Sequence, residues 1–156
     1  MTSPTNSGQL LTFVVAGEEF GVDILRVQEI RGWSRPMPLP TMPSYIKGVI
    51  NIRGDIVPIA DLRERLELPS LAPGPTTVTI VLRVVHAGTS RTMGIVVDAM
   101  SDVASVAPDA LKAPPELSSG SMASGIALVD QRMITILDVD RVFPAPNRSL
   151  DSDVAA

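Results

Sequence analysis

The chain contains no cysteine, a single histidine and very few aromatic residues, which make up 3% of its 156 positions. The absence of cysteine excludes disulfide bonds and thiolate metal sites. The scarcity of aromatic side chains means that the core has to be mainly aliphatic. No zinc-ligand spacing and no glycine-rich phosphate loop occur in the sequence. We therefore expect neither a metal nor a cofactor.

Basic residues are scarce as well, since lysine occurs only at Lys47 and Lys112 and the net charge is −4. A nucleic-acid-binding domain normally carries a basic face with interleaved aromatic residues. Neither feature is present. A barrel that binds single-stranded nucleic acid is therefore disfavoured, and no nucleic-acid partner is expected.

Long hydrophobic runs are also missing. No segment approaches the ~20 apolar residues of a membrane-spanning helix. Residues 1–8 lack the basic start and the apolar stretch of a signal peptide. The sequence therefore predicts a cytoplasmic protein without direct membrane insertion.

The residues that are abundant favour short strands and many turns. Hydrophobic residues make up 45% of the chain, which also holds 14 prolines and 11 glycines. This composition is typical of an all-β fold. About ten short strands can be assigned, and two small barrels packed together suit them better than one wide barrel. We assign residues 9–143 to a single domain, and residues 1–8 and 144–156 to flexible tails.

Local patterns locate the other elements. Strand 9–15 is apolar on both faces, which predicts a central position. In strand 76–85 we expect Val78 and Ile80 to face inward and Thr79 to face outward. Short helical turns are predicted at residues 24–26, 61–66 and 138–143, the first two capped by Asp23 and Asp61. Irregular connections are predicted at residues 33–44, 69–75, 86–90 and 108–122.

The most informative segment is the predicted hairpin 46–59, whose tip carries Arg53. Gly54 permits a positive φ at the turn, and the side chain of Asp55 can cap it. An arginine held on a short, stiff hairpin loses little conformational entropy on binding, which suits a protein–protein anchor. A solvated turn arginine paired with Asp55 is the alternative that spacing leaves open.

The candidate catalytic residues give no recognisable constellation. His86 falls in a predicted loop without a nucleophile or an orienting group nearby in sequence, which indicates a surface histidine. Asp98 and Asp102 could form a pair of carboxylates, but Asp98 is expected to end a buried strand and Asp102 to face solvent. We therefore expect no enzymatic activity and a function carried by surfaces. Trp33 follows Gly32 in a polar bend, either as a lid on the core or as an exposed anchor.

In four segments the chain resembles the CheW-type chemotaxis coupling proteins, in the family's order and with family-like spacing. These segments are Phe20–Ile30, Ile46–Arg63, Gly94–Asp98 and Ser101–Val103. Overall the resemblance extends over residues 9 to 143.

This resemblance implies two five-stranded, SH3-like barrels with a hydrophobic seam between them. It also implies a non-enzymatic adaptor. Members of the family bind the cytoplasmic tips of methyl-accepting chemoreceptors and the regulatory domain of the histidine kinase CheA, which shares the fold. Adaptor and kinase domain alternate in rings that join receptors into arrays.

The resemblance also implies site residues. Five positions correspond to the family's partner-binding surface: Val27, Glu29, Ile30, Arg53 and Ile56. Met100 and Val103 match positions associated with the receptor groove between the barrels. It leaves open whether Arg53 contacts the kinase or the receptor.

Two related functions remain as alternatives. The chain could serve a chemosensory system other than flagellar chemotaxis, such as pilus-based motility or gene regulation, and the residues do not separate these. A CheV-like protein is disfavoured, because no receiver domain follows residue 143.

Overall fold

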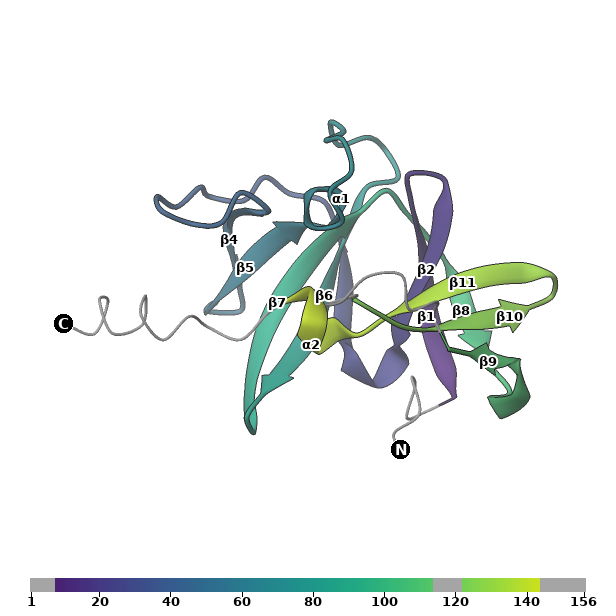
Figure 1. Cartoon of the computed structure of the whole chain (residues 1–156). Coiled ribbons are helices and arrows are strands. Elements are labelled where there is room, and N and C mark those ends of the chain that lie inside the picture. The colour runs from purple at the N-terminus through teal and green to yellow at the C-terminus, as the bar shows by residue number, and fades with distance from the viewer. Residues whose placement is uncertain (1–7, 114–121, 144–156) are drawn as a thin grey trace.

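The computed structural model describes residues 8–113 and 122–143, and these residues form two β-sheets (Figure 1). The first sheet has the strand order β8-β1-β2-β11-β10-β9, and the second has the order β3-β6-β7-β5-β4. The strands of the first sheet are β1 (Gln9–Val15), β2 (Glu18–Asp23), β8 (Ala99–Ser105), β9 (Leu111–Lys112), β10 (Ala123–Val129) and β11 (Arg132–Leu137). Those of the second are β3 (Val27–Gly32), β4 (Ile46–Ile52), β5 (Asp55–Asp61), β6 (Val78–His86) and β7 (Thr89–Val97).

We call the first sheet subdomain 1 and the second subdomain 2. The predicted all-β fold of two SH3-like subdomains is confirmed. Subdomain 1 has a sixth strand, β9, which has two residues and pairs with β10. Because β9 lies within the segment 108–122, the prediction of a loop there is wrong for these two residues. Residues 114–121 of that segment lie outside the described residues, as do residues 1–7 and 144–156 of the predicted tails.

Four short helical elements complete the described fold: η1 (Ile24–Arg26), α1 (Leu62–Arg65), η2 (Pro108–Ala110) and α2 (Val139–Val142). The predicted capping is confirmed, because the Asp23 carboxylate accepts from the Leu25 N–H and the Asp61 carboxylate accepts from the Arg63 N–H. Each described helix has only three or four residues, so none is long enough to cross a membrane.

The largest apolar cluster lies between the two subdomains, and we call it the seam. It contains side chains of both sheets, among them Leu11 and Phe13 of β1 and Leu82 of β6, together with Phe143 after α2. Each of these four is at most 2% exposed. Because burial of apolar area is the main driving force of folding, the seam holds the subdomains together as one body.

Strands β1 and β6 each contribute to two cores. Leu10 points into a cluster confined to subdomain 1, whereas its neighbour Leu11 points into the seam. In the same way, Val81 points into a cluster confined to subdomain 2 and Ile80 into the seam. The central position predicted for 9–15 is therefore confirmed. The outward position predicted for Thr79 is wrong, because β6 is covered on both faces at this position and Thr79 is 3% exposed.

Turns determine where the hairpins reverse. The β6–β7 hairpin turns at Ala87 and Gly88, both with positive φ, so the strands continue through most of the predicted loop 86–90. His86 consequently ends β6 and is half-buried, with its Nε2 2.8 Å from the Asp140 carbonyl oxygen. The prediction of a surface histidine in a loop is therefore wrong.

Two ion pairs join the short elements beside the seam. The Arg26 guanidinium donates two hydrogen bonds to the Asp140 carboxylate of α2, at 2.7 and 2.8 Å. The Arg63 guanidinium of α1 donates to both carboxylate oxygens of Asp98, at 2.9 and 2.6 Å. Asp98 follows β7, and its carboxylate also accepts from the Ala16 N–H of the β1–β2 turn at 2.8 Å. Asp98 therefore joins α1, the end of β7 and the β1–β2 turn.

We predict that Asp98→Asn lowers the free energy of unfolding by about 1–2 kcal/mol, because it replaces a charge-assisted, two-pronged pair by weaker bonds. Urea denaturation of the full chain measures this. Asp109→Asn is the control, since Asp109 is exposed, and we expect a change below about 0.5 kcal/mol. Equal midpoints for the two variants would contradict a structural role for Asp98.

The same variant gives a pH signature. Hydrogen bonds from Arg63 hold the pKa of the Asp98 carboxyl below its ordinary value of 3.8. A lowered folded-state pKa stabilises the fold fully above the unfolded value, and this stabilisation is lost as the pH falls through the folded value. The stability difference between wild type and Asp98→Asn should therefore be constant near neutrality and shrink below pH 3.8.

Candidate functional site

The hairpin tip that carries Arg53 is a two-residue turn between β4 and β5. Ile52 pairs with Asp55, so that Arg53 and Gly54 form the turn, with φ of 50° and 91°. The positive φ expected at Gly54 is confirmed. The prediction that Asp55 caps the turn is wrong. The Gly54 N–H instead donates to the Asn51 side-chain oxygen at 2.8 Å.

The Arg53 side chain is 77% exposed and contacts Glu29. Its Nη2 donates to the Glu29 carboxylate at 2.6 Å. Asp55, its partner in the alternative that spacing left open, is not the residue that Arg53 binds. Glu29 lies on β3 and Arg53 next to β4, and these are the two edge strands of the five-stranded sheet. The ion pair thus shows that the sheet of subdomain 2 curls until its edges meet. Residue spacing did not reveal this contact, since it joins positions 24 residues apart.

Apolar side chains accompany this ion pair in subdomain 2. Ile56 on β5 is 65% exposed and Ile30 on β3 is 44% exposed. Val27, at the start of β3, is half-buried and packs against the seam. We call these three residues, together with Glu29 and Arg53, the Arg53 surface. Exposed aliphatic groups beside a guanidinium are typical of the anchors in protein–protein interfaces.

The remaining two predicted site residues lie in the other subdomain. Met100 and Val103 are on β8, an edge strand of the first sheet. Met100 is half-buried against the seam, whereas Val103 is 52% exposed. Five of the seven predicted residues therefore belong to subdomain 2 and two to subdomain 1. We call Met100 and Val103 together the β8 edge.

Asp98 and Asp102, which were considered as a possible pair of carboxylates, both have structural roles. Asp98 is bound by Arg63, as described above. The hydroxyl of the buried Thr12 donates to Asp102 at 2.6 Å, and Arg132 lies 3.2 Å from the same carboxylate. These two partners, Thr12 first, hold the pKa of the Asp102 carboxyl below its usual range. Each carboxylate is thus bound to its own partners.

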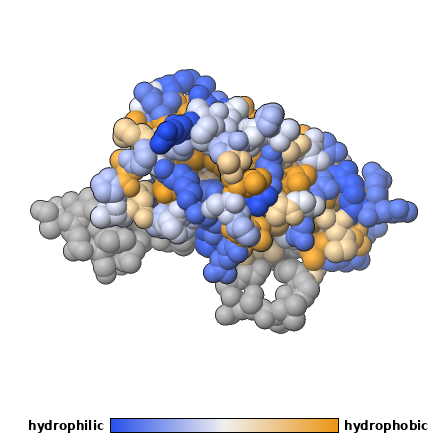
Figure 2. Space-filling view, turned by 90° about the horizontal axis from the view of Figure 1, so that it is seen from above, coloured by the Kyte–Doolittle hydropathy of each residue, from blue (hydrophilic) through white to orange (hydrophobic). Residues whose placement is uncertain are grey.

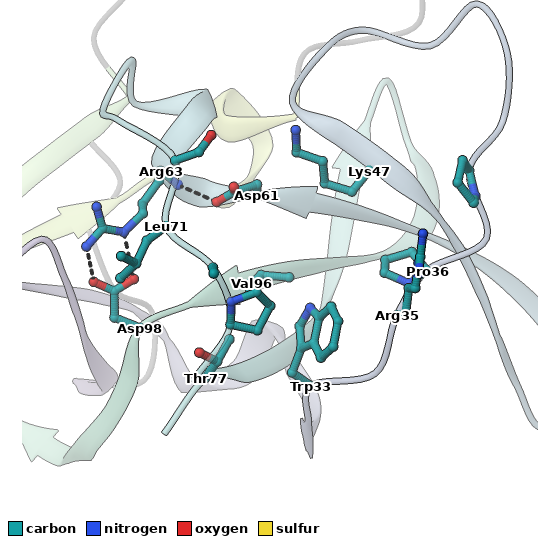
Figure 3. Close-up of a pocket in the computed structure, with 14 residues that line it drawn as sticks. Trp33, Arg35, Pro36, Lys47, Asp61, Arg63, Leu71, Thr77, Val96 and Asp98 are labelled. Carbon is teal, nitrogen blue, oxygen red and sulfur yellow. Dashed lines mark hydrogen bonds and ion pairs between the residues drawn. The ribbon is translucent and has the colours of Figure 1, made fainter. Parts of the chain in front are cut away.

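A cavity of about 420 Å³ beside Trp33 was not predicted (Figure 3). It lies between the connection 33–44 and the loop that follows Pro69, at the ends of β5 and β7. Trp33 is 37% exposed and lines it. One indication of this cavity was present in the sequence, the open question whether Trp33 covers the core or is exposed. The rest of the cavity could not be predicted, because its walls come from segments that carry no periodic pattern.

Comparison with known proteins shows the family to which the chain belongs. A model of the CheW-like domain matches residues 9–147. The chain belongs to the CheW-like family. The chemotaxis protein CheW of Rhizobium meliloti is 39% identical over 148 residues, covering 92% of this chain and 93% of the relative. The CheW of Klebsiella aerogenes is 34% identical over 158 residues, covering 99% and 93%.

A solved structure supports the same assignment. The crystal structure of the scaffolding protein TtCheW from Thermoanaerobacter tengcongensis matches with a TM-score of 0.79 and 27% sequence identity. The match covers 88% of this chain and 92% of that protein. The resemblance to the CheW family drawn from the sequence is therefore confirmed. The roles of its seven site residues remain a prediction.

We predict that Arg53→Glu leaves this CheW-like fold intact. The Arg53–Glu29 pair is exposed on the arginine side, and such pairs contribute at most about 1 kcal/mol. Urea denaturation should show a loss within that limit, and the far-ultraviolet circular dichroism should be unchanged. A loss above about 2 kcal/mol would instead make the ion pair a structural contact that closes subdomain 2.

Proposed function

We propose that the chain is a non-enzymatic adaptor that couples methyl-accepting chemoreceptors to a CheA-type histidine kinase and helps to assemble receptor arrays. Its partners are the regulatory domain of the kinase and the cytoplasmic tip of the receptor. It acts in the cytoplasm and is held at the membrane arrays through protein contacts alone. The relatives named chemotaxis proteins support chemotaxis over pilus motility or gene regulation.

The observation that carries the proposal is the pre-ordered Arg53 at a tight turn. One guanidinium nitrogen is held by Glu29, and the group makes no other hydrogen bond to the described residues. Because a guanidinium has five N–H donors, it can keep Glu29 and still bind an acceptor on a partner. Exposed Ile56 supplies apolar area close to the same turn. An ordered side chain loses less entropy on binding, which strengthens a contact of modest size.

An adaptor also needs a second surface in a fixed relation to the first. The β8 edge lies on subdomain 1, and the seam joins the two subdomains into one body. Half-exposed Val103 and half-buried Met100 give it an apolar character suited to a helix of the receptor hairpin. Two modest contacts on one rigid body reinforce each other through effective concentration. Such an arrangement is stable as an array and can still be remodelled.

The first test is co-sedimentation with receptor-containing membranes in the presence of a CheA-type kinase, followed by kinase activity. We expect Arg53→Glu to weaken binding about tenfold, the equivalent of ~1.4 kcal/mol. Arg83→Glu is the matched charge reversal, on an exposed position of β6, and should bind as wild type does. If the wild-type chain binds neither kinase nor receptor, the proposed function is wrong.

A second variant separates the two surfaces. Val103→Asp places a charge in the apolar part of the β8 edge, and we expect about tenfold weaker binding to receptor membranes. Binding of the isolated regulatory domain of the kinase should be unchanged. Ser105→Asp, an exposed change on the same strand, is the control. Equal losses of kinase and receptor binding in Val103→Asp would show that the β8 edge is not a receptor surface.

A further inference from the structure

The cavity beside Trp33 has one wall that is fixed by backbone hydrogen bonds. The proline-rich connection 33–44 is bridged to β4, because Met37 and Val49 exchange two hydrogen bonds, of 2.8 and 2.9 Å. Gly48 allows this close approach, since a Cβ there would lie 2.1 Å from the Met37 carbonyl oxygen. This wall is therefore held in place without a ligand.

The opposite wall is the loop after α1, which is also tied down. Arg63 donates to the Pro69 carbonyl oxygen at 3.1 Å, and the Gly74 N–H donates to the Thr77 hydroxyl at 2.8 Å. Thr76 donates to the Asp98 carbonyl oxygen at 2.9 Å. A cavity of about 420 Å³ between two fixed walls is of the size that ligand pockets have.

The lining of the cavity is largely apolar. Trp33 and Leu71 present side chains that are 37% and 61% exposed, with Pro36, Pro73 and Val96 beside them. Figure 2 views the molecule from the side on which α1 lies in Figure 1. It shows hydrophobic residues in the middle of that side, between hydrophilic ones. Burying an exposed leucine and an indole face under a ligand is favourable by the hydrophobic effect.

The charges around the cavity differ in whether they are already paired. Arg63 is bound to Asp98, and Lys47 forms an ion pair with Glu64. Arg35 is exposed and has no ion pair or hydrogen bond with the other described residues. Figure 3 shows Arg35 and Lys47 along one side of the cavity and the Arg63–Asp98 pair along the other. The unpaired positive charge at the cavity is therefore the Arg35 guanidinium.

Asp61 limits where an acidic group can sit. Its carboxylate lines the cavity and accepts from the Arg63 N–H, and burial raises its pKa above the usual value. A second carboxylate beside Asp61 would be repelled. A ligand therefore has to place its apolar part between Trp33 and Leu71, with its carboxylate at the rim near Arg35.

We propose that this cavity binds an extended peptide segment of a protein partner, which inserts one large apolar side chain and presents an adjacent carboxylate to Arg35. None of the seven residues of the Arg53 surface and the β8 edge lines the cavity. It is thus a third surface, and the inference does not depend on the proposed function. An SH3-like subdomain would then recognise a peptide through an aromatic-lined cavity between two loops.

Trp33 makes the test direct, because it is the only tryptophan in the chain. The probe is a capped tetrapeptide of sequence alanine-phenylalanine-aspartate-alanine, added to the full chain while the tryptophan emission is followed. We expect a saturable change in emission. Replacing the aspartate of the probe by asparagine should raise the Kd about fivefold, and replacing its phenylalanine by alanine should abolish the change.

Matched variants place the binding in the cavity. Arg35→Gln should raise the Kd about fivefold, and Leu71→Ser should raise it by a similar factor. Arg83→Gln, at an exposed position outside the cavity, should bind the probe as wild type does. Arg53→Glu should also bind the probe normally, while Arg35→Gln should still co-sediment with receptor membranes. These two variants make failure of this inference distinguishable from failure of the proposed function.

Three outcomes would overturn the inference. The first is no saturable response of Trp33 to the peptide. The second is a response that Arg53→Glu abolishes and Arg35→Gln leaves unchanged, which would place the peptide on the Arg53 surface. The third is tighter binding of free N-acetylphenylalanine than of the tetrapeptide, which would assign the cavity to a small carboxylate instead.

Discussion

The apolar seam between the two sheets is the contact on which the rest of the molecule depends. Strands β1 and β6 each contribute side chains from one face to the seam and from the other face to the core of their own subdomain. Subdomain 2 has only a small core of its own, made of four buried residues. Its stability therefore comes largely from the packing against subdomain 1, and the same packing sets the relative orientation of the Arg53 surface and the β8 edge. A substitution in the seam should therefore lower the stability of the fold and disturb the relative orientation of these two surfaces together.

Polar contacts beside the seam select one arrangement among those that apolar packing allows. Hydrophobic burial is not directional, so packing alone leaves small rotations and slips open. The Arg26–Asp140 and Arg63–Asp98 pairs are two-pronged and fix the direction of the groups they join. Arg65 adds a third tie, because its Nε donates to the Val142 carbonyl oxygen at 2.6 Å. These contacts orient the subdomains that the seam holds together.

Much of the fold could be predicted from the sequence because it depends on local patterns. Apolar alternation located the strands, and the caps Asp23 and Asp61 located η1 and α1. The errors concern properties that depend on distant parts of the chain. Thr79 is buried because β6 is covered on both faces at this position, and Arg53 pairs with Glu29 because the sheet curls. The positions in the Arg53 surface came from family resemblance, and the cavity beside Trp33 arises from two irregular walls that no periodicity marks.

The order of the strands along the chain has a mechanical consequence. Subdomain 2 is one continuous stretch, whereas subdomain 1 is made of β1 and β2 before it and β8 to β11 after it. The chain therefore crosses between the subdomains at η1 and again at Asp98, and α2 returns to pack near β6. A domain joined by one linker can swivel when its partners pull on it. Here two covalent crossings and the contact of α2 with β6 restrict such rotation. A displacement imposed on one subdomain is therefore transmitted to the other as a movement of the whole body.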